Sequence, residues 1–203
     1  MKTVTLGDIQ ISNARPFALL AGPCQLESLD HARMLAGEIT EVTSDLGVPF
    51  IFKASYDKAN RTSLSGQRGL GIEKDMAHVL DKVTSTGNDQ VMLCERGTSF
   101  GYNTLVSDFR GLPEMAKTGH PVVFDATHSV QQPGGQGGAT GGQREMVPVL
   151  ARAAVAVGVG ALFMEVHQAP DTAPSDGPNM VRLEDLRGIL ETLVALDGVT
   201  KGG

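Results

Sequence analysis

The chain has 203 residues, 41% of them hydrophobic and 20% charged, which predicts one globular domain spanning residues 1–203 with a single sizeable core. Its net charge of −6 and pI near 5.3 disfavour a nucleic-acid-binding protein and a protein that binds anionic membranes. Two cysteines far apart fit a cytoplasmic protein without disulfides, and no apolar stretch reaches the roughly 20 residues that a transmembrane helix needs.

The predicted elements begin with a β-hairpin over residues 3–11, where apolar residues alternate around the turn residues Gly7 and Asp8. Five strand–helix units follow. In each, a short apolar run, typical of a strand buried on both faces of a parallel sheet, precedes a segment with apolar residues at helical spacing. The strands are predicted at residues 17–21, 48–52, 91–94, 122–124 and 161–166, and the helices at residues 29–46, 72–83, 105–116, 144–157 and 183–196.

Five β/α units predict a parallel sheet, either open and doubly wound or closed as a β/α barrel. In both architectures the active site lies at the carboxyl ends of the strands. The polar and charged residues of this chain cluster after the strands, whereas the glycine-rich segment 132–142 reads as a loop. We therefore expect the functional residues in the segments that follow the strands.

The first two strands are followed by a thiol and by a group of cations. Cys24 follows the first strand, and a cysteine taken alone is more often simply packed in the core. Lys53, Lys58 and Arg61 follow the second strand within nine positions of one another, on a segment rich in hydroxyls and amides. Lysine and arginine there suit carboxylate and phosphate groups, although a solvated surface loop is the alternative interpretation.

The third and fourth strands end in paired acids and bases. Glu95 and Arg96 precede Gly97, which lets the backbone turn tightly and a ligand approach; a plain surface ion pair is the alternative. Asp125 follows the fourth strand, close enough to His128 to orient its imidazole. A lone histidine is otherwise more often structural than a ligand.

The fifth strand contains Glu165 between apolar neighbours, where an unpaired buried carboxylate would cost several kcal/mol or become protonated. A cation partner is the simplest account. Cys24, His128, Glu165 and Asp176 each lie at or just beyond a strand end. Thiolate, imidazole and two carboxylates suit Zn²⁺, Fe²⁺, Mn²⁺ or Co²⁺, so the chain is predicted to be a metalloenzyme with a coordination position open to water or substrate.

Five motifs in order carry a resemblance to a known family. They are Ala-Gly-Pro-Cys-x-x-Glu-Ser, Phe-Lys-Ala-Ser-Tyr-Asp-Lys-Ala-Asn-Arg-Thr-Ser, Cys-Glu-Arg-Gly-Thr-x-Phe-Gly-Tyr-Asn, Phe-Asp-Ala-Thr-His-Ser and Met-Glu-Val-His followed by Ser-Asp-Gly-Pro-Asn. Nearly end to end, the chain resembles the 3-deoxy-D-manno-octulosonate 8-phosphate synthases. The resemblance implies a β/α (TIM) barrel, usually a homotetramer, that condenses phosphoenolpyruvate with D-arabinose 5-phosphate and water. The products are the eight-carbon sugar acid phosphate, a lipopolysaccharide precursor, and inorganic phosphate.

The same resemblance implies roles for individual residues. Metal-dependent members have Cys in the first motif and metal-independent members have Asn, so Cys24, His128, Glu165 and Asp176 are expected to hold a divalent metal. Lys53, Ser55 and Lys58 match positions near the phosphoenolpyruvate carboxylate, and Arg96 matches the position that binds its phosphate. Asn60, Arg61 and Thr62 match the stretch that receives arabinose 5-phosphate, with Arg61 on its phosphate. The expected catalytic residues are Lys53, Lys58, Asp125 and His128.

Two questions of mechanism stay open at this point. Asp125 or Glu95 could assist proton transfer, or either could only position other groups. A bound metal could lower the pKa of a water molecule or orient the aldehyde.

The chain departs from this family in length. The family barrel has eight strands and typically about 250 residues, whereas five strands are predicted here and the sequence breaks near residues 82–84. The third to fifth strands are absent, together with a Thr-Asp-Val-His-Glu-like and a Lys-Lys-Gly-Gln-like motif that supply an aspartate and a lysine to the phosphoenolpyruvate site. We predict that the natural protein has an interior segment that this sequence omits, because an open remnant would expose sheet edges.

Two alternatives to this function remain. A truncated, non-catalytic remnant would also lack the lysine motif. The related 3-deoxy-D-arabino-heptulosonate 7-phosphate synthases use erythrose 4-phosphate, but their loop generally reads Lys-Pro-Arg-Thr-Ser where this chain has Lys-Ala-Asn-Arg-Thr-Ser.

Overall fold

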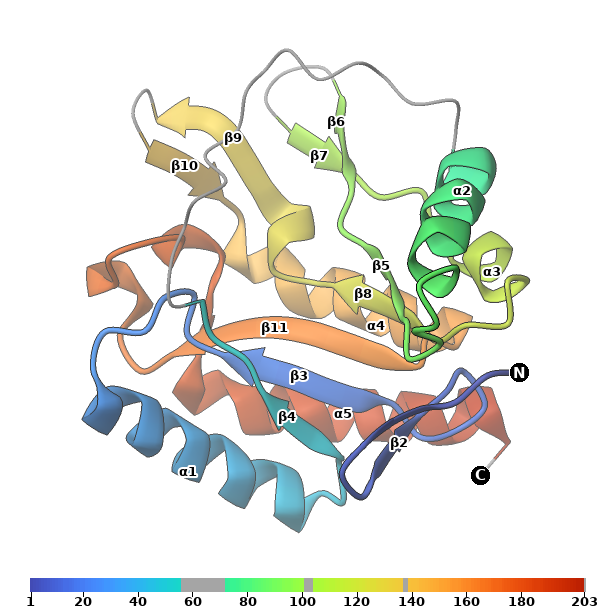
Figure 1. Ribbon diagram of the computed structural model, residues 1–203. Helices are drawn as coiled ribbons and strands as arrows, with labels where there is room; N and C mark the ends of the chain where they lie inside the picture. Colours follow the sequence, from blue (N-terminus) through green and yellow to red (C-terminus); the bar gives the residue numbers. More distant parts are fainter. Residues whose placement is uncertain (56–71, 101–103, 137–138, 203) are drawn as a thin grey trace.

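A parallel sheet forms the centre of the computed structural model, which describes residues 1–55, 72–100, 104–136 and 139–202 (Figure 1). Its main strands pair in the order β4-β3-β11-β8-β5, and β12 also pairs with β11. The strands are β3 (Ala18–Gly22), β4 (Phe50–Phe52), β5 (Leu93–Glu95), β8 (Val122–Asp125), β11 (Ala161–His167) and β12 (Val181–Arg182). The five predicted strands are thus confirmed, with ends shifted by one or two residues.

The five predicted helices are present as well. They are α1 (Leu29–Asp45), α2 (Ile72–Thr84), α3 (Gly111–Ala116), α4 (Val147–Val157) and α5 (Leu183–Lys201). The Ser28 side chain accepts the His31 N–H and so caps the start of α1, whereas α4 stops at Gly158, whose φ of 99° lies in the left-handed region. Residues 144–146, predicted as the first turn of a helix, instead form the 3₁₀ helix η2 (Arg144–Met146).

The helix predicted over residues 105–116 is wrong in its first half. Residues 104–106 form strand β7 (Thr104–Val106), paired with β6 (Thr98–Phe100), and the helix begins only at Gly111. The Asp108 carboxylate accepts the backbone N–H of Arg110 and so forms a local turn that competes with helix. Periodicity alone did not reveal this turn.

Two further hairpins flank the sheet. The predicted hairpin at the start is confirmed as β1 (Val4–Leu6) paired with β2 (Ile9–Ile11). The glycine-rich segment predicted as a loop instead forms β9 (Gln131–Gln136) and β10 (Ala139–Gly142). Glycines can form these strands because the hydrogen bonds between paired strands come from the backbone. At position 142 a glycine is also required, since the Cβ of any other residue would lie 1.3 Å from Asn179 Oδ1.

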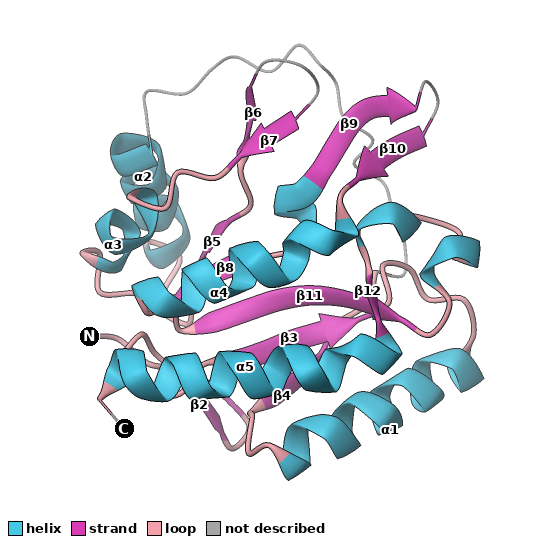
Figure 2. Cartoon of the chain, turned by 180° about the vertical axis from the view of Figure 1, so that it is seen from behind, coloured by secondary structure: helices cyan, strands magenta, loops and turns pink. Residues whose placement is uncertain are grey.

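Helices α1, α4 and α5 pack on one side of the sheet. Seen from behind, α4 and α5 run roughly along β11 and β3, with α1 beside α5 (Figure 2). The main core lies between these layers and includes Leu19, Phe124, Leu162 and Leu190, all buried. A second, smaller cluster lies under the hairpin of β1 and β2, and its rim is only half-buried at Leu20, Ile51, Met92 and Phe163.

The strand order places the first and last β/α units side by side. β3 pairs with β11 from Ala18↔Ala161 to Gly22↔Glu165, while β4 and β5, the second and third units, form the two edges. This is the order of neighbouring strands in a β/α barrel, with an interruption between the second and third units. In the part of the chain that the structure describes, β4 and β5 do not pair.

Among the described helices, none combines the length and apolar character needed to cross a membrane.

Candidate active site

The carboxyl ends of β3, β8 and β11 bring the four predicted metal ligands together. Cys24 lies two residues beyond Gly22, which is the register partner of Glu165. The Cys24 Sγ donates a hydrogen bond to Asp176 Oδ2 at 2.9 Å, and ligand atoms of Cys24, Glu165 and Asp176 all lie within 4.8 Å of one another. The Nε2 of His128 lies 3.5 Å from Glu165 Oε1, so the four side chains form one cluster.

Asp125 orients the imidazole of His128 with both of its carboxylate oxygens. Oδ1 accepts the backbone N–H of His128 at 2.8 Å, and Oδ2 contacts the ring Nδ1 at 2.7 Å. Nδ1 donates in this bond, which leaves the Nε2 lone pair of the neutral ring facing Glu165. Burial alone would lower the pKa of His128, but the hydrogen bond and charge of Asp125 and the charge of Glu165 raise that pKa above its ordinary value.

Glu165 is fully buried, and its carboxylate lies between two groups that can carry positive charge. Lys53 Nζ is 3.7 Å from Oε1, and His128 Nε2 approaches the same oxygen. The Glu165 backbone N–H donates to Thr127 Oγ1 at 2.8 Å, which fixes the strand end. A cationic partner was predicted for Glu165 from the sequence, whereas the role of Thr127 was not.

Asp176 is the only non-glycine residue with a positive φ in the described part of the chain, at 54°. Aspartate tolerates this left-handed conformation better than most residues, and such conformations are often found at functional sites. Its Oδ1 accepts from Gln131 Nε2 at 3.1 Å, and Gln131 Oε1 in turn accepts from Arg96 at 3.1 Å. Gln131 was missed because a glutamine beside a glycine-rich segment gives no distinctive sequence signal.

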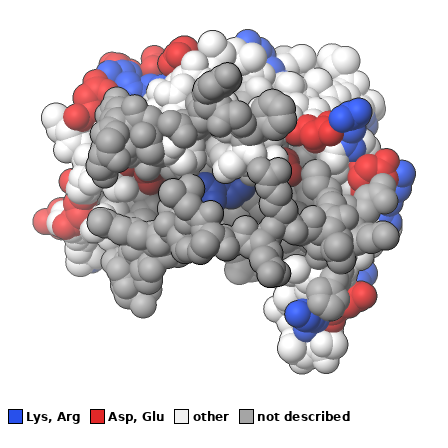
Figure 3. Space-filling model, turned by 90° about the horizontal axis from the view of Figure 1, so that it is seen from above, with Lys and Arg blue, Asp and Glu red and all other residues white. Residues whose placement is uncertain are grey.

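Two of the predicted substrate-binding cations, Lys53 and Arg96, lie near the ligand cluster, since Lys53 approaches Glu165 and Arg96 contacts Gln131. Lys53 Nζ donates to Ser55 Oγ at 3.2 Å and lies 4.8 Å from the centre of the Phe163 ring, on which His128 also stacks. In the view from above, Lys or Arg surface lies near the middle of this face with acidic surface close by (Figure 3). The remaining predicted residues, Lys58, Asn60, Arg61 and Thr62, lie outside the described residues.

Glu95, the other acid considered for proton transfer, is engaged locally. Its Oε1 accepts the backbone N–H of Gly97 at 2.6 Å, and Gly97 has a φ of 84°. Burial raises the pKa of Glu95, the Gly97 N–H opposes that rise, and the charge of Asp108 adds to it. Glu95 therefore shapes the turn that carries Arg96.

The donor set fits a divalent metal ion. The thiol of Cys24, the fully buried carboxylate of Glu165 and the carboxylate of Asp176 converge, and the imidazole of His128 lies beside Glu165. Soft and hard donors in this mixture suit borderline ions. In the structure the Cys24 thiol donates to Asp176, and a metal would take the place of that proton.

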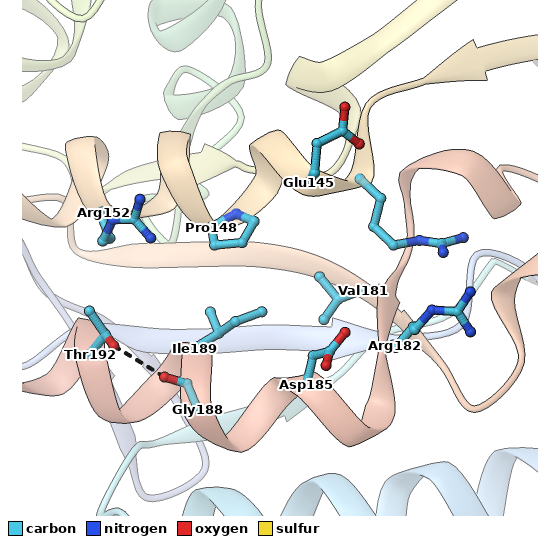
Figure 4. Close-up of a pocket in the computed structure, with 10 residues that line it drawn as sticks. Glu145, Pro148, Arg152, Val181, Arg182, Asp185, Gly188, Ile189 and Thr192 are labelled. Carbon is cyan, nitrogen blue, oxygen red and sulfur yellow. Dashed lines mark hydrogen bonds between the residues drawn. The ribbon is translucent and has the colours of Figure 1, made fainter.

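A separate cavity of about 590 Å³ lies between α4 and α5, on the helical side of the sheet (Figure 4). Polar residues such as Arg152, Arg182 and Asp185 line it, but none of the predicted site residues does. Arg182 also pairs with Asp171. This cavity is therefore separate from the candidate site at the strand ends.

Comparison with known proteins gives a consistent result. The model of the DAHP synthetase I family matches residues 2–81 and 74–201. The 2-dehydro-3-deoxyphosphooctonate aldolase of Agrobacterium fabrum is 46% identical over 272 aligned residues, which cover 98% of this chain and 96% of the relative. The enzyme of the same name from Brucella anthropi is 45% identical over 270 residues, covering 98% of each chain, and that of Rhizobium meliloti is 46% identical over 265 residues, covering 96% and 95%.

These alignments are longer than the 203-residue chain, so each relative has residues at positions where this chain has none. The two segments matched by the family model meet at residues 74–81, within α2.

Proposed function

The chain belongs to the DAHP synthetase I family, and from that premise we propose that it condenses phosphoenolpyruvate with D-arabinose 5-phosphate and water. The products are 3-deoxy-D-manno-octulosonate 8-phosphate and phosphate, which places the reaction in the synthesis of lipopolysaccharide precursors. The observation that best supports this chemistry is the cluster of Cys24, His128, Glu165 and Asp176 beside Lys53 at the strand ends.

The reaction requires two anionic substrates to be held close together in an acidic protein. A carbon–carbon bond forms between C3 of phosphoenolpyruvate and the aldehyde carbon. Water adds its oxygen to C2 and one of its protons goes to the former aldehyde oxygen. Phosphate then leaves with the electron pair of the C2–O bond and the second proton of the water, and C2 becomes a ketone. We assign the carboxylate of phosphoenolpyruvate to Lys53, and its phosphate to Arg96, which contacts Gln131.

We include in this proposal a divalent metal held by Cys24, His128, Glu165 and Asp176. When bound, such an ion supplies a Lewis acid that orients and polarises the aldehyde or lowers the pKa of a water molecule. Asp125 positions His128, because both of its oxygens are used in that contact. Full activity after chelator treatment, with no metal in protein purified without chelator, would overturn this part of the proposal.

We also propose that the natural protein is a closed β/α barrel with further β/α units between α2 and β5. Three findings support this: β4 and β5 are the sheet edges, the second apolar cluster is rimmed by half-buried apolar residues, and the relatives align over more residues than this chain has. The inserted units would carry the aspartate and lysine motifs of the family. The homotetramer and the cytoplasmic location implied by the resemblance belong to the same proposal, and light scattering tests the tetramer.

The deciding experiment measures phosphate release and product mass with phosphoenolpyruvate and each of two aldose phosphates. We expect the natural protein to use arabinose 5-phosphate and to use erythrose 4-phosphate poorly; the reverse preference would favour the heptulosonate phosphate synthase reaction. Its intact mass should exceed the 21.3 kDa of the 203-residue chain. An active protein of 21.3 kDa would overturn the proposed interior segment.

A further inference from the structure

Glu27 and His167 form a contact that joins the two segments carrying metal ligands. Glu27 is three residues after Cys24, and His167 is two residues after Glu165. The Nε2 of His167 lies 2.7 Å from Glu27 Oε1. The His167 side chain is 3% exposed and the Glu27 side chain 35%, so the contact is buried at the histidine and partly open to solvent at the carboxylate.

The hydrogen bonds of His167 determine which of its nitrogens carries the proton. The backbone N–H of Ala169 donates to Nδ1 at 2.9 Å, so Nδ1 is an acceptor. In the neutral ring Nε2 must then be protonated, and it donates to the Glu27 carboxylate. Ligand atoms of Glu27, His31 and His167 lie within 4.8 Å of one another, but Nε2 of His167 has no lone pair to offer a metal while the Ala169 bond is present.

The segment around Cys24 is held on two sides. On one side Ser55 lies next to it: the Leu26 N–H donates to Ser55 O at 2.9 Å, and the Ser55 N–H donates to Cys24 O at 3.3 Å. On the other side is the bond between Glu27 and His167. β3 ends at Gly22, so beyond the strand the backbone around the thiol is held by the isolated parallel bridge of Gln25 with Ser55 and by the contact of Glu27 with His167.

The first turn of α1 adds to this contact. The His31 ring lies 4.9 Å from the His167 ring, and its Nε2 contacts Gln168 Oε1 at 3.0 Å. The side chains of Glu27, His31 and His167 therefore connect the start of α1 to the end of β11.

We propose that Glu27 and His167 are positioning residues that set the distance between the Cys24 thiolate and the carboxylates of Glu165 and Asp176, and that the strength of metal binding depends on their hydrogen bond. The inference rests on the proposed metal site. Neither residue is a ligand or touches the reacting atoms in this assignment.

The test is a Co²⁺ titration of metal-free protein, followed by the thiolate-to-cobalt charge-transfer band, with thermal unfolding measured in parallel. Glu27→Ala removes the acceptor. His167→Asn keeps an acceptor for the Ala169 N–H but is too short to reach Glu27. Glu27→Gln keeps an acceptor oxygen and is the conservative variant, and Glu38→Ala, on the exposed side of α1, is the matched control.

We expect Glu27→Ala and His167→Asn to weaken Co²⁺ binding about tenfold and to shift or weaken the band. Glu27→Gln should recover most of the affinity, and Glu38→Ala should match the unchanged protein. Since Glu27 is one-third exposed, its variants should remain folded.

The outcomes separate this inference from the function on which it rests. If the unchanged protein shows no charge-transfer band, the metal site itself is wrong. If the unchanged protein shows the band, and Glu27→Ala melts at a lower temperature but keeps the affinity and spectrum, the contact is only structural and the inference is overturned. A second bound Co²⁺ that is lost in His167→Asn would overturn the assigned protonation of His167 and make the cluster a metal site.

Discussion

Replacing Lys53 with Met tests whether the ammonium group of Lys53 stabilises the buried carboxylate of Glu165 in the metal-free protein. The two charged groups are 3.7 Å apart, and Glu165 is fully buried. Removing one partner of a buried ion pair costs about 3–5 kcal/mol. Lys53 is 34% exposed, which screens part of the attraction, and His128 remains beside Glu165, so we expect a loss of about 2 kcal/mol in the free energy of unfolding. For a chain of this size that is a decrease of roughly 4–8 °C in Tm.

The same substitution should have the opposite effect on metal binding. Lys53 repels a cation at Glu165 and competes with it for the carboxylate, so Lys53→Met should bind Co²⁺ at least as tightly as the unchanged protein. Circular dichroism melts in chelator and in Co²⁺ measure both effects, with Lys82→Met, on an exposed part of α2, as the control. The reasoning is refuted if Lys53→Met is as stable as the unchanged protein in chelator, or if it binds Co²⁺ more weakly.

Other substitutions test the substrate assignments, the thiol and the packing. Arg61→Ala should raise the KM for arabinose 5-phosphate and Arg96→Ala that for phosphoenolpyruvate, each by tenfold or more, since a charge-assisted contact contributes about 1.5–3 kcal/mol; equal effects on both substrates would contradict the assignment. Cys24→Asn should lose metal but keep some activity and Cys24→Ala should be worse, whereas an Ala variant that keeps its metal and outperforms Asn would make Cys24 a core residue. In urea titrations Gly142→Ala should lose at least about 2 kcal/mol, because its Cβ would lie 1.3 Å from a buried amide oxygen, while Gly188→Ala, with open space around it, should gain about 0.5–1 kcal/mol.

The sequence predicts the sheet well because its central strands, β3, β8 and β11, are largely buried on both faces. Continuous apolar runs such as residues 17–21 have no amphipathic alternative, and all five predicted runs became parallel strands. The hairpins of β6 with β7 and β9 with β10 were missed because short, polar or glycine-rich strands depend on backbone pairing with a partner, which composition does not reveal.

Within the site, the sequence identified groups whose chemistry is unusual for their position. A carboxylate in an apolar strand and an aspartate three residues before a histidine were informative in this way, and the structure brings Glu165, Asp125 and His128 together. Gln131 and Phe163 were not identified, because an amide and an aromatic ring are common everywhere and acquire their roles only through the distance to Asp176 and Lys53. Metal occupancy stays a prediction.

The pairing of β3 with β11 has a consequence for how this chain folds. Residues 18 and 161 are register partners in the sheet, and the Ala18 N–H donates to Gly160 O, so the central pairing has a very large separation in sequence. Such long-range parallel contacts form slowly, and during synthesis β3 must wait until the last β/α unit has left the ribosome. Cys24 comes from one side of this pairing and Glu165 and Asp176 from the other. The candidate site can therefore form only after the last β/α unit has been synthesised, and partly synthesised chains expose the carboxyl end of β3 without β11 as its partner.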